Sequence, residues 1–121
     1  MPQLIIEYSD NIKALDESAL LLSLNQHLIQ TGLVVGKDLK SRIHANHRFL
    51  IGLGDQQQAY VHAHLYILNG RSLAEKKLLA DQVFAALQQF DYGQGLGLDL
   101  QLCVELTEMP IDDYRKAVVQ I

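Results

Sequence analysis

A pattern of strand, helix and strand occurs twice along this chain, and it constrains the fold more than any other feature of the sequence. In each copy, a strand-like run precedes a stretch with apolar residues at helical spacing, and a stretch of alternating apolar and polar residues follows. A connection between parallel strands through a helix is right-handed almost without exception, so both helices are expected on the same face of one sheet. The pattern predicts an α/β (α+β) fold made of a duplicated β-α-β unit, with a four-stranded mixed sheet and two helices on one face.

The first half begins with a predicted strand over residues 4–8. Asp16 or Ser18 can cap the helix that follows, and Gly32 suits the left-handed position just past its end. Residues 39–51 alternate again and predict a strand or a strand hairpin with one buried face. The predicted buried side of the helix consists of Leu20, Leu21, Leu24, Leu28 and Ile29.

The second half follows a loop over residues 52–58, and its first predicted strand covers residues 60–68. Ser72 and Glu75 form a capping box, in which each side chain accepts an early amide hydrogen of a helix. This helix is expected to stop within residues 91–97, where three glycines occur, and a last strand follows over residues 98–106. The predicted buried stripe of the helix consists of Leu79, Val83, Phe84, Leu87 and Phe90.

The length of the chain allows one domain. With 121 residues, of which 49% are hydrophobic, it can form one core but is too short for two ordinary domains. The two halves span about residues 1–51 and 58–108, and residues 109–121 form a C-terminal tail. The sheet face without helices is expected to be polar, and it is either solvated or covered by other copies of the chain. Its predicted residues include His62, His64, Asp99, Gln101 and Glu105.

Composition excludes several classes of function. The net charge of −4 offers no basic footprint for a phosphate backbone, so nucleic acid is not an expected partner. A single cysteine, Cys103, rules out an internal disulfide and suits a reducing compartment, so the cytoplasm is expected. No run approaches the ~20 apolar residues that a membrane span needs.

Pro2 is an unusual residue at the start of a strand. It has no amide hydrogen to give to a strand ladder, and the first position of a strand tolerates this. If Met1 is removed, the Pro2 nitrogen becomes a free secondary amine. Burial or a nearby cation would lower the pKa of such an amine, because both disfavour its charged form. A neutral amine of this kind can act as a general base, although proline is also common at the second position for reasons of processing alone.

Three stretches, MPQLIIEYSDN, KSRIH and NGRSLAEKK, together resemble the 5-carboxymethyl-2-hydroxymuconate isomerases of the tautomerase superfamily. The resemblance runs from Pro2 to about Glu108 and weakens in the tail. It implies a trimer in which three sheets surround a central axis. It also implies a cofactor-independent isomerase that uses Pro2 as its base on small unsaturated dicarboxylates, in the bacterial breakdown of aromatic acids.

The resemblance also suggests which cations bind the substrate. Arg71 lies in the matching GRS motif, just before a helix start, where an arginine can hold a carboxylate through two hydrogen bonds. The family has an arginine where this chain has Lys40, and a lysine supplies the charge without the planar fork. Arg42 lies two residues along the strand on the same side and could substitute. Read without the family, all three cations could simply be solvated.

Other readings of the sequence remain open. The chain could catalyse another tautomerase-superfamily reaction, such as phenylpyruvate-type tautomerisation or decarboxylation, or it could be a trimeric ligand-binding module without turnover.

His62 and His64 share a strand face, but no third ligand at a convincing spacing supports a metal site. Cys103 is expected to serve in packing. If Pro2 were not the base, the catalytic group would be sought among Glu7, His44 and His47.

Overall fold

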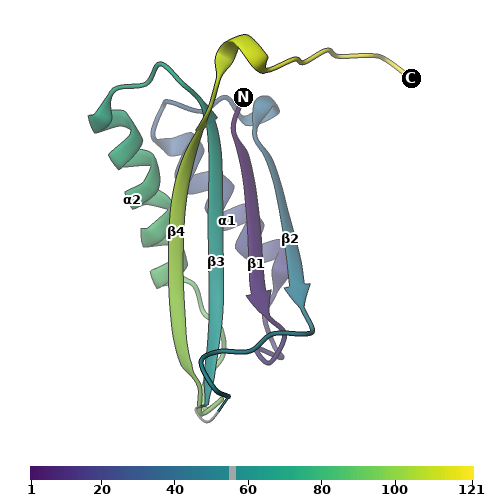
Figure 1. Cartoon of the computed structure of the whole chain (residues 1–121), viewed down its shortest axis with the longest axis vertical. Helices are drawn as coiled ribbons and strands as arrows, with labels where there is room; N and C mark the ends of the chain where they lie inside the picture. Colours follow the sequence, from purple (N-terminus) through teal and green to yellow (C-terminus); the bar gives the residue numbers. More distant parts are fainter. Residues whose placement is uncertain (55–56) are drawn as a thin grey trace.

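The computed structural model describes residues 1–54 and 57–121 and contains one four-stranded sheet with the strand order β2-β1-β3-β4 (Figure 1). Two short 3-10 turns, η1 (Gly36–Asp38) and η2 (Ile111–Asp113), lie before β2 and after β4. The main elements are β1 (Gln3–Ser9), α1 (Glu17–Gln30), β2 (Lys40–Asn46), β3 (Gln58–Leu68), α2 (Leu73–Gln89) and β4 (Asp99–Met109).

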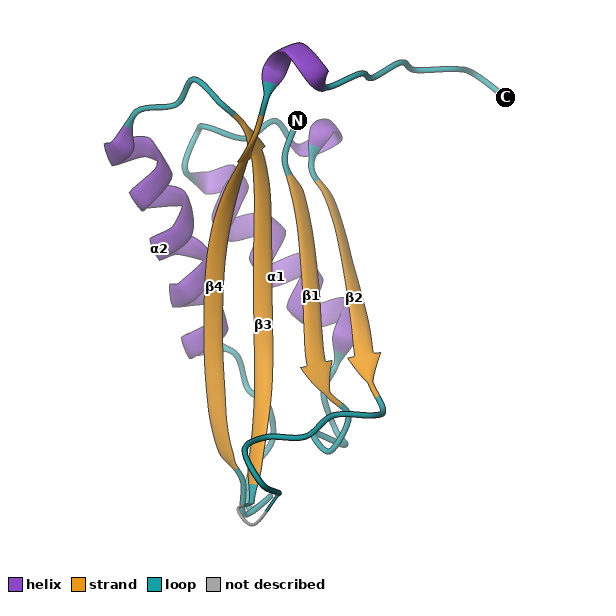
Figure 2. Cartoon of the chain, in the orientation of Figure 1, coloured by secondary structure: helices purple, strands orange, loops and turns teal. Residues whose placement is uncertain are grey.

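The sheet is mixed, as the repeated pattern predicts. β1 pairs in parallel with β2, β3 pairs in parallel with β4, and the two halves meet where β1 and β3 run antiparallel. Both helices lie behind the same face of the sheet (Figure 2). The α+β architecture with two helices on one face is therefore confirmed.

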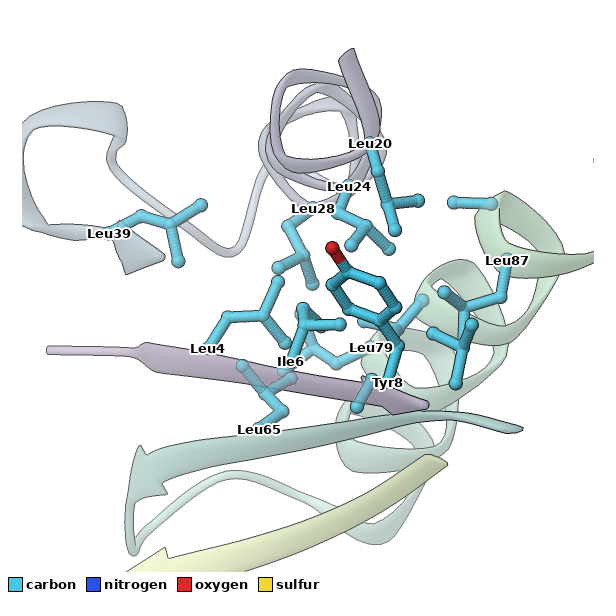
Figure 3. Packing of buried hydrophobic residues seen from close by; sticks show 14 of the residues in the cluster. Leu4, Ile6, Tyr8, Leu20, Leu24, Leu28, Leu39, Leu65, Leu79 and Leu87 are labelled. Carbon is cyan, nitrogen blue, oxygen red and sulfur yellow. The ribbon is translucent and has the colours of Figure 1, made fainter. Parts of the chain in front are cut away.

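The core lies between the sheet and the two helices (Figure 3). Alternate residues of the central strands point into it, because successive side chains of a strand face opposite sides of the sheet. Two residues of the predicted helix stripes, Ile29 and Phe84, are 43% and 39% exposed. Each follows a buried residue and is rotated about 100° further around its helix, so it lies at the edge of the contact. The fully enclosed leucines and isoleucine are Leu4, Ile6, Leu20, Leu24, Leu28, Leu65, Leu79 and Leu87.

Local hydrogen bonds fix where the helices begin. Of the two predicted caps of α1, it is Asp16 that accepts the amide hydrogen of Ala19, at 3.0 Å. The predicted capping box of α2 is present, with Ser72 Oγ accepting from the Glu75 amide at 3.1 Å and Glu75 accepting from the Ser72 amide at 2.9 Å. Gly32 has a positive φ of 75°, as expected for the left-handed residue just past the end of α1.

The second strand is shorter than predicted. β2 ends at Asn46, so neither a strand over 39–51 nor a hairpin forms. The reason is its neighbour, because β1 ends at Ser9 and offers no further pairing partner beyond Asn46. The predicted loop over 52–58 includes residues 55–56, which lie outside the described residues. β4 is longer than predicted and continues to Met109.

The second face of the sheet carries polar side chains, as predicted, and we call it the open face. The pairing of β3 with β4 places His62 beside Cys103 and His64 beside Glu105 on this face. Cys103 is exposed in the single chain, so the expectation that it serves in packing is wrong for the isolated chain. Within residues 1–54 and 57–121, no helix is long and apolar enough to cross a membrane.

Candidate active site

Pro2 lies at the end of the sheet where β1 begins and β3 finishes (Figure 1). The residue is buried, and its carbonyl oxygen accepts the amide hydrogen of Lys40 at 3.3 Å. A cavity of about 290 Å³, which we call the Pro2 cavity, opens beside it. Its wall includes Met1, Pro2, Val34, Ile67, Gly70 and Arg71.

Arg71 reaches the Pro2 cavity because β3 ends at Leu68 and the chain turns through Gly70 before α2. Gly70 has a φ of 111°, a conformation that favours glycine. The Arg71 guanidinium donates to the carbonyl oxygen of Leu33 and to Glu75 Oε2 at 3.5 Å. These two acceptors hold the arginine in the cavity wall. The structure thus brings Pro2 and Arg71, two of the predicted site residues, to one cavity.

Lys40 lies next to Pro2 but lines a different hollow. Its Nζ donates to the carbonyl oxygen of Asp38 at 3.3 Å. The hollow has a volume of about 830 Å³, and we call it the lysine hollow. Its wall includes Met1, Lys37, Asp38, Lys40, Lys116 and Val118. Met1 belongs to both walls, so it lies between the Pro2 cavity and the lysine hollow.

Arg42 is placed elsewhere. It does share the face of Lys40 on β2, as predicted, and this is the open face of the sheet. Its Nη1 donates to Gln3 Oε1 at 2.9 Å, and its side chain is exposed. The neighbouring strand β1 thus supplies the partner of Arg42, and the guanidinium points along the open face instead of into the Pro2 cavity.

The charges around the first residue favour a neutral amine. Burial lowers the pKa of the Met1 amino group below its ordinary value. Asp38 opposes this shift, whereas Arg71, Lys116 and Lys40 add to it, because a cation disfavours a second positive charge nearby. While Met1 is attached, the Pro2 nitrogen is an amide and has no basicity. Removal of Met1 would place the Pro2 amine within the same group of charges.

Sequence reasoning missed two charged residues at this end of the molecule. Lys116 of the C-terminal tail forms an ion pair with Asp38, with its Nζ 2.8 Å from Oδ1. The hydrogen bond from Lys116 is the largest cause of the lowered pKa of the Asp38 carboxyl. The two residues are far apart in sequence and share no motif, so the sequence gives no signal for the pair.

The histidines of the open face form a separate cluster. Glu105 Oε1 lies 2.9 Å from His62 Nε2 and 3.2 Å from His64 Nδ1, and His64 Nε2 lies 2.8 Å from Thr107 Oγ1. Across the ranges that the structure describes, no three His, Cys, Asp or Glu side chains are placed to hold a metal ion.

The alternative bases lie away from the Pro2 cavity wall. Glu7 and His44 line a hollow on the open face. His47 follows the end of β2, at the opposite end of the sheet from Pro2.

Comparison of the sequence and the structure with known proteins identifies relatives of this chain. The family model of 5-carboxymethyl-2-hydroxymuconate isomerase matches residues 2–119. A 5-carboxymethyl-2-hydroxymuconate Delta-isomerase of Escherichia coli is 32% identical over 89 residues, which cover 73% of this chain and 71% of that protein. The crystal structure of a 5-carboxymethyl-2-hydroxymuconate isomerase from Deinococcus radiodurans R1 is similar with a TM-score of 0.87 and 26% identity, covering 96% of this chain and 88% of the other. A macrophage migration inhibitory factor-like protein from Entamoeba histolytica shares the fold, with a TM-score of 0.58, 14% identity, and coverage of 96% and 95%.

Proposed function

Since this chain belongs to the 5-carboxymethyl-2-hydroxymuconate isomerase family and is an isomerase, we propose that it acts on unsaturated 2-hydroxy and 2-oxo dicarboxylates of the 5-carboxymethyl-2-hydroxymuconate type. In this proposal Pro2, freed by removal of Met1, is the general base. The observation that carries it is the shared wall of the Pro2 cavity, where Pro2 and Arg71 lie together. A base and a carboxylate-binding cation are the two groups that such a reaction requires.

The proposed reaction moves one proton and needs no cofactor. The neutral Pro2 amine accepts the proton of the substrate's 2-hydroxyl group, and the oxygen keeps the electron pair as a dienolate. The C2–O bond becomes a carbonyl, the double bonds shift along the conjugated chain, and the Pro2 ammonium returns the proton to a carbon further along. A positioned base is worth about 10²–10⁴ in rate.

Arg71 is proposed to bind a substrate carboxylate in the Pro2 cavity. Its contacts with Leu33 and Glu75 hold the guanidinium in place before substrate arrives, so less freedom is lost on binding. A cation beside the reacting groups also stabilises the negative charge of the dienolate. Arg71 therefore serves both binding and the charge that develops in the transition state.

The open face supports the proposal of a homotrimer. The two helices cover one side of the sheet and leave the other to a mixed surface that includes Ile5, Tyr66 and the pairs of Glu105 with His62 and His64. Packing of three such faces around an axis would shield these pairs from water. Analytical ultracentrifugation at micromolar concentration checks this, and a monomer there would contradict it.

The decisive experiment tests the Pro2 nitrogen. We would compare three proteins: one that begins at Pro2, as verified by mass spectrometry, one with a glycine inserted before Pro2, and Pro2→Ala. Isomerisation of 5-carboxymethyl-2-hydroxymuconate is followed by ultraviolet absorbance. The insertion should abolish nearly all activity because it converts the amine to an amide, and Pro2→Ala should lose much of the rate because it keeps only a flexible primary amine. Full activity of the glycine-inserted protein would rule out Pro2 as the base.

A second activity is favoured by one observation. By the family resemblance, Lys40 stands where an arginine is expected, and it lies with two other lysines around the lysine hollow, which supports a second carboxylate site unlike the expected one. Another tautomerase-superfamily reaction, such as phenylpyruvate-type tautomerisation or decarboxylation, is the alternative. Comparing kcat/KM for a dienol dicarboxylate, phenylenolpyruvate and a decarboxylation substrate decides between them.

A further inference from the structure

The C-terminal segment runs across the end of the molecule that holds Pro2. After η2 the chain leaves β4 and passes the N-terminus, as Figure 1 shows, without forming a helix or a strand. Lys116 lies on this segment, and its Nζ is 3.7 Å from Met1 Sδ. The segment therefore places an ammonium group directly beside the residue whose removal would expose the Pro2 amine.

Lys116 is held in this position. Its ion pair with Asp38 measures 2.8 Å, and the two side chains are 29% and 22% exposed. An ion pair that is partly open to water adds little to stability, but this short contact places the ammonium group beside Asp38. Asp38 lies in η1, which leads directly into β2, so the ammonium is fixed relative to the sheet.

The lysine hollow carries more positive than negative charge. Lys37, Lys40 and Lys116 line it, against one carboxylate from Asp38. A small anion is therefore the kind of ligand that this hollow attracts. Because Met1 forms part of both walls, its removal would open the Pro2 cavity towards the lysine hollow.

We propose that Lys116 binds the second carboxylate of the substrate, while Arg71 binds the first. The C-terminal segment then forms one wall of the active site, and Asp38 is a positioning residue that orients Lys116. This inference rests on the proposed function and adds a specificity-determining residue to it. It predicts that the enzyme distinguishes dicarboxylates from monocarboxylates through Lys116.

The chemistry of an ammonium group permits this role. Lys116 has three donor hydrogens, so it can give one to Asp38 and still offer two to a ligand. Lys40 gives one of its own hydrogens to the backbone of Asp38, so both ammonium groups converge near the same residue. Either ammonium group supplies the same single positive charge as an arginine, although not its planar geometry.

Binding of two stable keto acids tests the proposal without catalysis. 2-Oxoadipate and 2-oxohexanoate have the same length and differ in one carboxylate, and their affinities for protein that begins at Pro2 are measured by isothermal titration calorimetry. Lys116→Met should lower the affinity for 2-oxoadipate about tenfold and change the affinity for 2-oxohexanoate by less than about twofold, because only the first ligand loses a charge-assisted hydrogen bond. Arg71→Ala should lower the affinity for both ligands.

Two control variants separate binding from structure. Lys116→Arg keeps the charge and should retain most of the affinity for 2-oxoadipate. Lys77→Met breaks a similar lysine–aspartate pair on the exposed side of α2, at 2.9 Å, and should change neither affinity. Equal weakening of both ligands by Lys116→Met, no weakening of either, or a wild-type protein that does not bind 2-oxoadipate would overturn the proposal. If the wild-type protein binds 2-oxoadipate through Lys116 but does not isomerise 5-carboxymethyl-2-hydroxymuconate, only the proposed function is overturned.

Discussion

Glu75 Oε2 lies 3.5 Å from Arg71 Nη1, while Oε1 of the same carboxylate accepts the Ser72 amide hydrogen at 2.9 Å. One side chain thus connects the cap of α2 to the proposed substrate-binding arginine. The hydrogen bond with Ser72 is the largest cause of the lowered pKa of the Glu75 carboxyl, and Arg71 contributes further. The start of α2 and the wall of the Pro2 cavity are therefore parts of one hydrogen-bonded unit.

Substitution of Arg71 should reduce substrate capture. Arg71→Ala removes a charge-assisted contact worth about 1.5–3 kcal/mol, so kcat/KM for the dicarboxylate should fall about 10- to 100-fold. Arg71→Lys should recover part of this loss, because it restores the charge without the two parallel hydrogen bonds. Steady-state kinetics measure both variants, and circular dichroism confirms that α2 remains folded. An Arg71→Ala protein with unchanged kcat/KM would remove Arg71 from the site.

The two predicted serine caps should differ in their effect on stability. Ser72→Ala removes the side-chain acceptor of the capping box and should lower the free energy of unfolding by about 1 kcal/mol. Ser18→Ala is the matched control, because Ser18 is exposed in the first turn of α1 and Asp16 supplies that cap. It should leave stability unchanged within about 0.5 kcal/mol. Urea unfolding compares the two, and an equal loss in both variants would contradict the assignment of the caps.

The elements that local sequence determines could be predicted, and contacts between distant segments could not. The capping box of Ser72 and Glu75 depends on residues three apart, so the motif alone was sufficient. The pair of Lys116 with Asp38 depends on how the tail crosses the N-terminal end, which no local pattern encodes. Arg42 could be predicted in part. Strand alternation predicted the sheet face on which it lies, but its hydrogen-bond partner Gln3 depends on the pairing of β1 with β2.

The Tyr8 hydroxyl should make stability depend on alkaline pH. Burial first, and then the hydrogen bond to Glu17 at 2.9 Å, raise the pKa of Tyr8 from 10.0 to about 12. A group whose pKa is raised by folding contributes stability that is fully present below its unfolded pKa and is lost as pH rises through the folded value. The advantage of the wild type over Tyr8→Phe should therefore persist to about pH 10 and decline towards pH 12.

Urea midpoints between pH 8 and pH 11.5 measure this dependence. Tyr114→Phe, in the C-terminal segment outside the core, serves as the control and should follow the wild type throughout. If the gap between the wild type and Tyr8→Phe stays constant up to pH 11.5, the Tyr8 hydroxyl does not titrate as its surroundings indicate.

Lys40→Arg introduces the arginine that the family resemblance predicts at this position. An arginine here could bind a carboxylate with two parallel hydrogen bonds, so turnover of 5-carboxymethyl-2-hydroxymuconate should be unchanged or improved. KM is the quantity expected to fall. Reduced activity would show instead that the lysine suits a different ligand, and the role carried over from the family arginine would be wrong at this position.

If Pro2 is the general base, as proposed, catalysis should depend on pH in a stated direction. Burial together with Arg71, Lys116 and Lys40 lowers the pKa of the terminal amine, and Asp38 opposes the shift. Removal of Met1 would place the Pro2 amine among the same groups, so kcat/KM should rise with pH through an apparent pKa below that of free proline. The direction follows because only the neutral amine can accept the hydroxyl proton.

Two charge substitutions should move this apparent pKa in opposite directions. Arg71→Ala removes a cation and makes protonation of the amine easier, so the profile should shift to higher pH. Asp38→Asn removes the anion that stabilises the ammonium form, so the profile should shift to lower pH. Lys77→Met, a charge change on the exposed side of α2, is the control and should leave the profile in place. Because kcat/KM reports the ionisation of the free enzyme, profiles that do not separate in this order would mean that another group supplies the base.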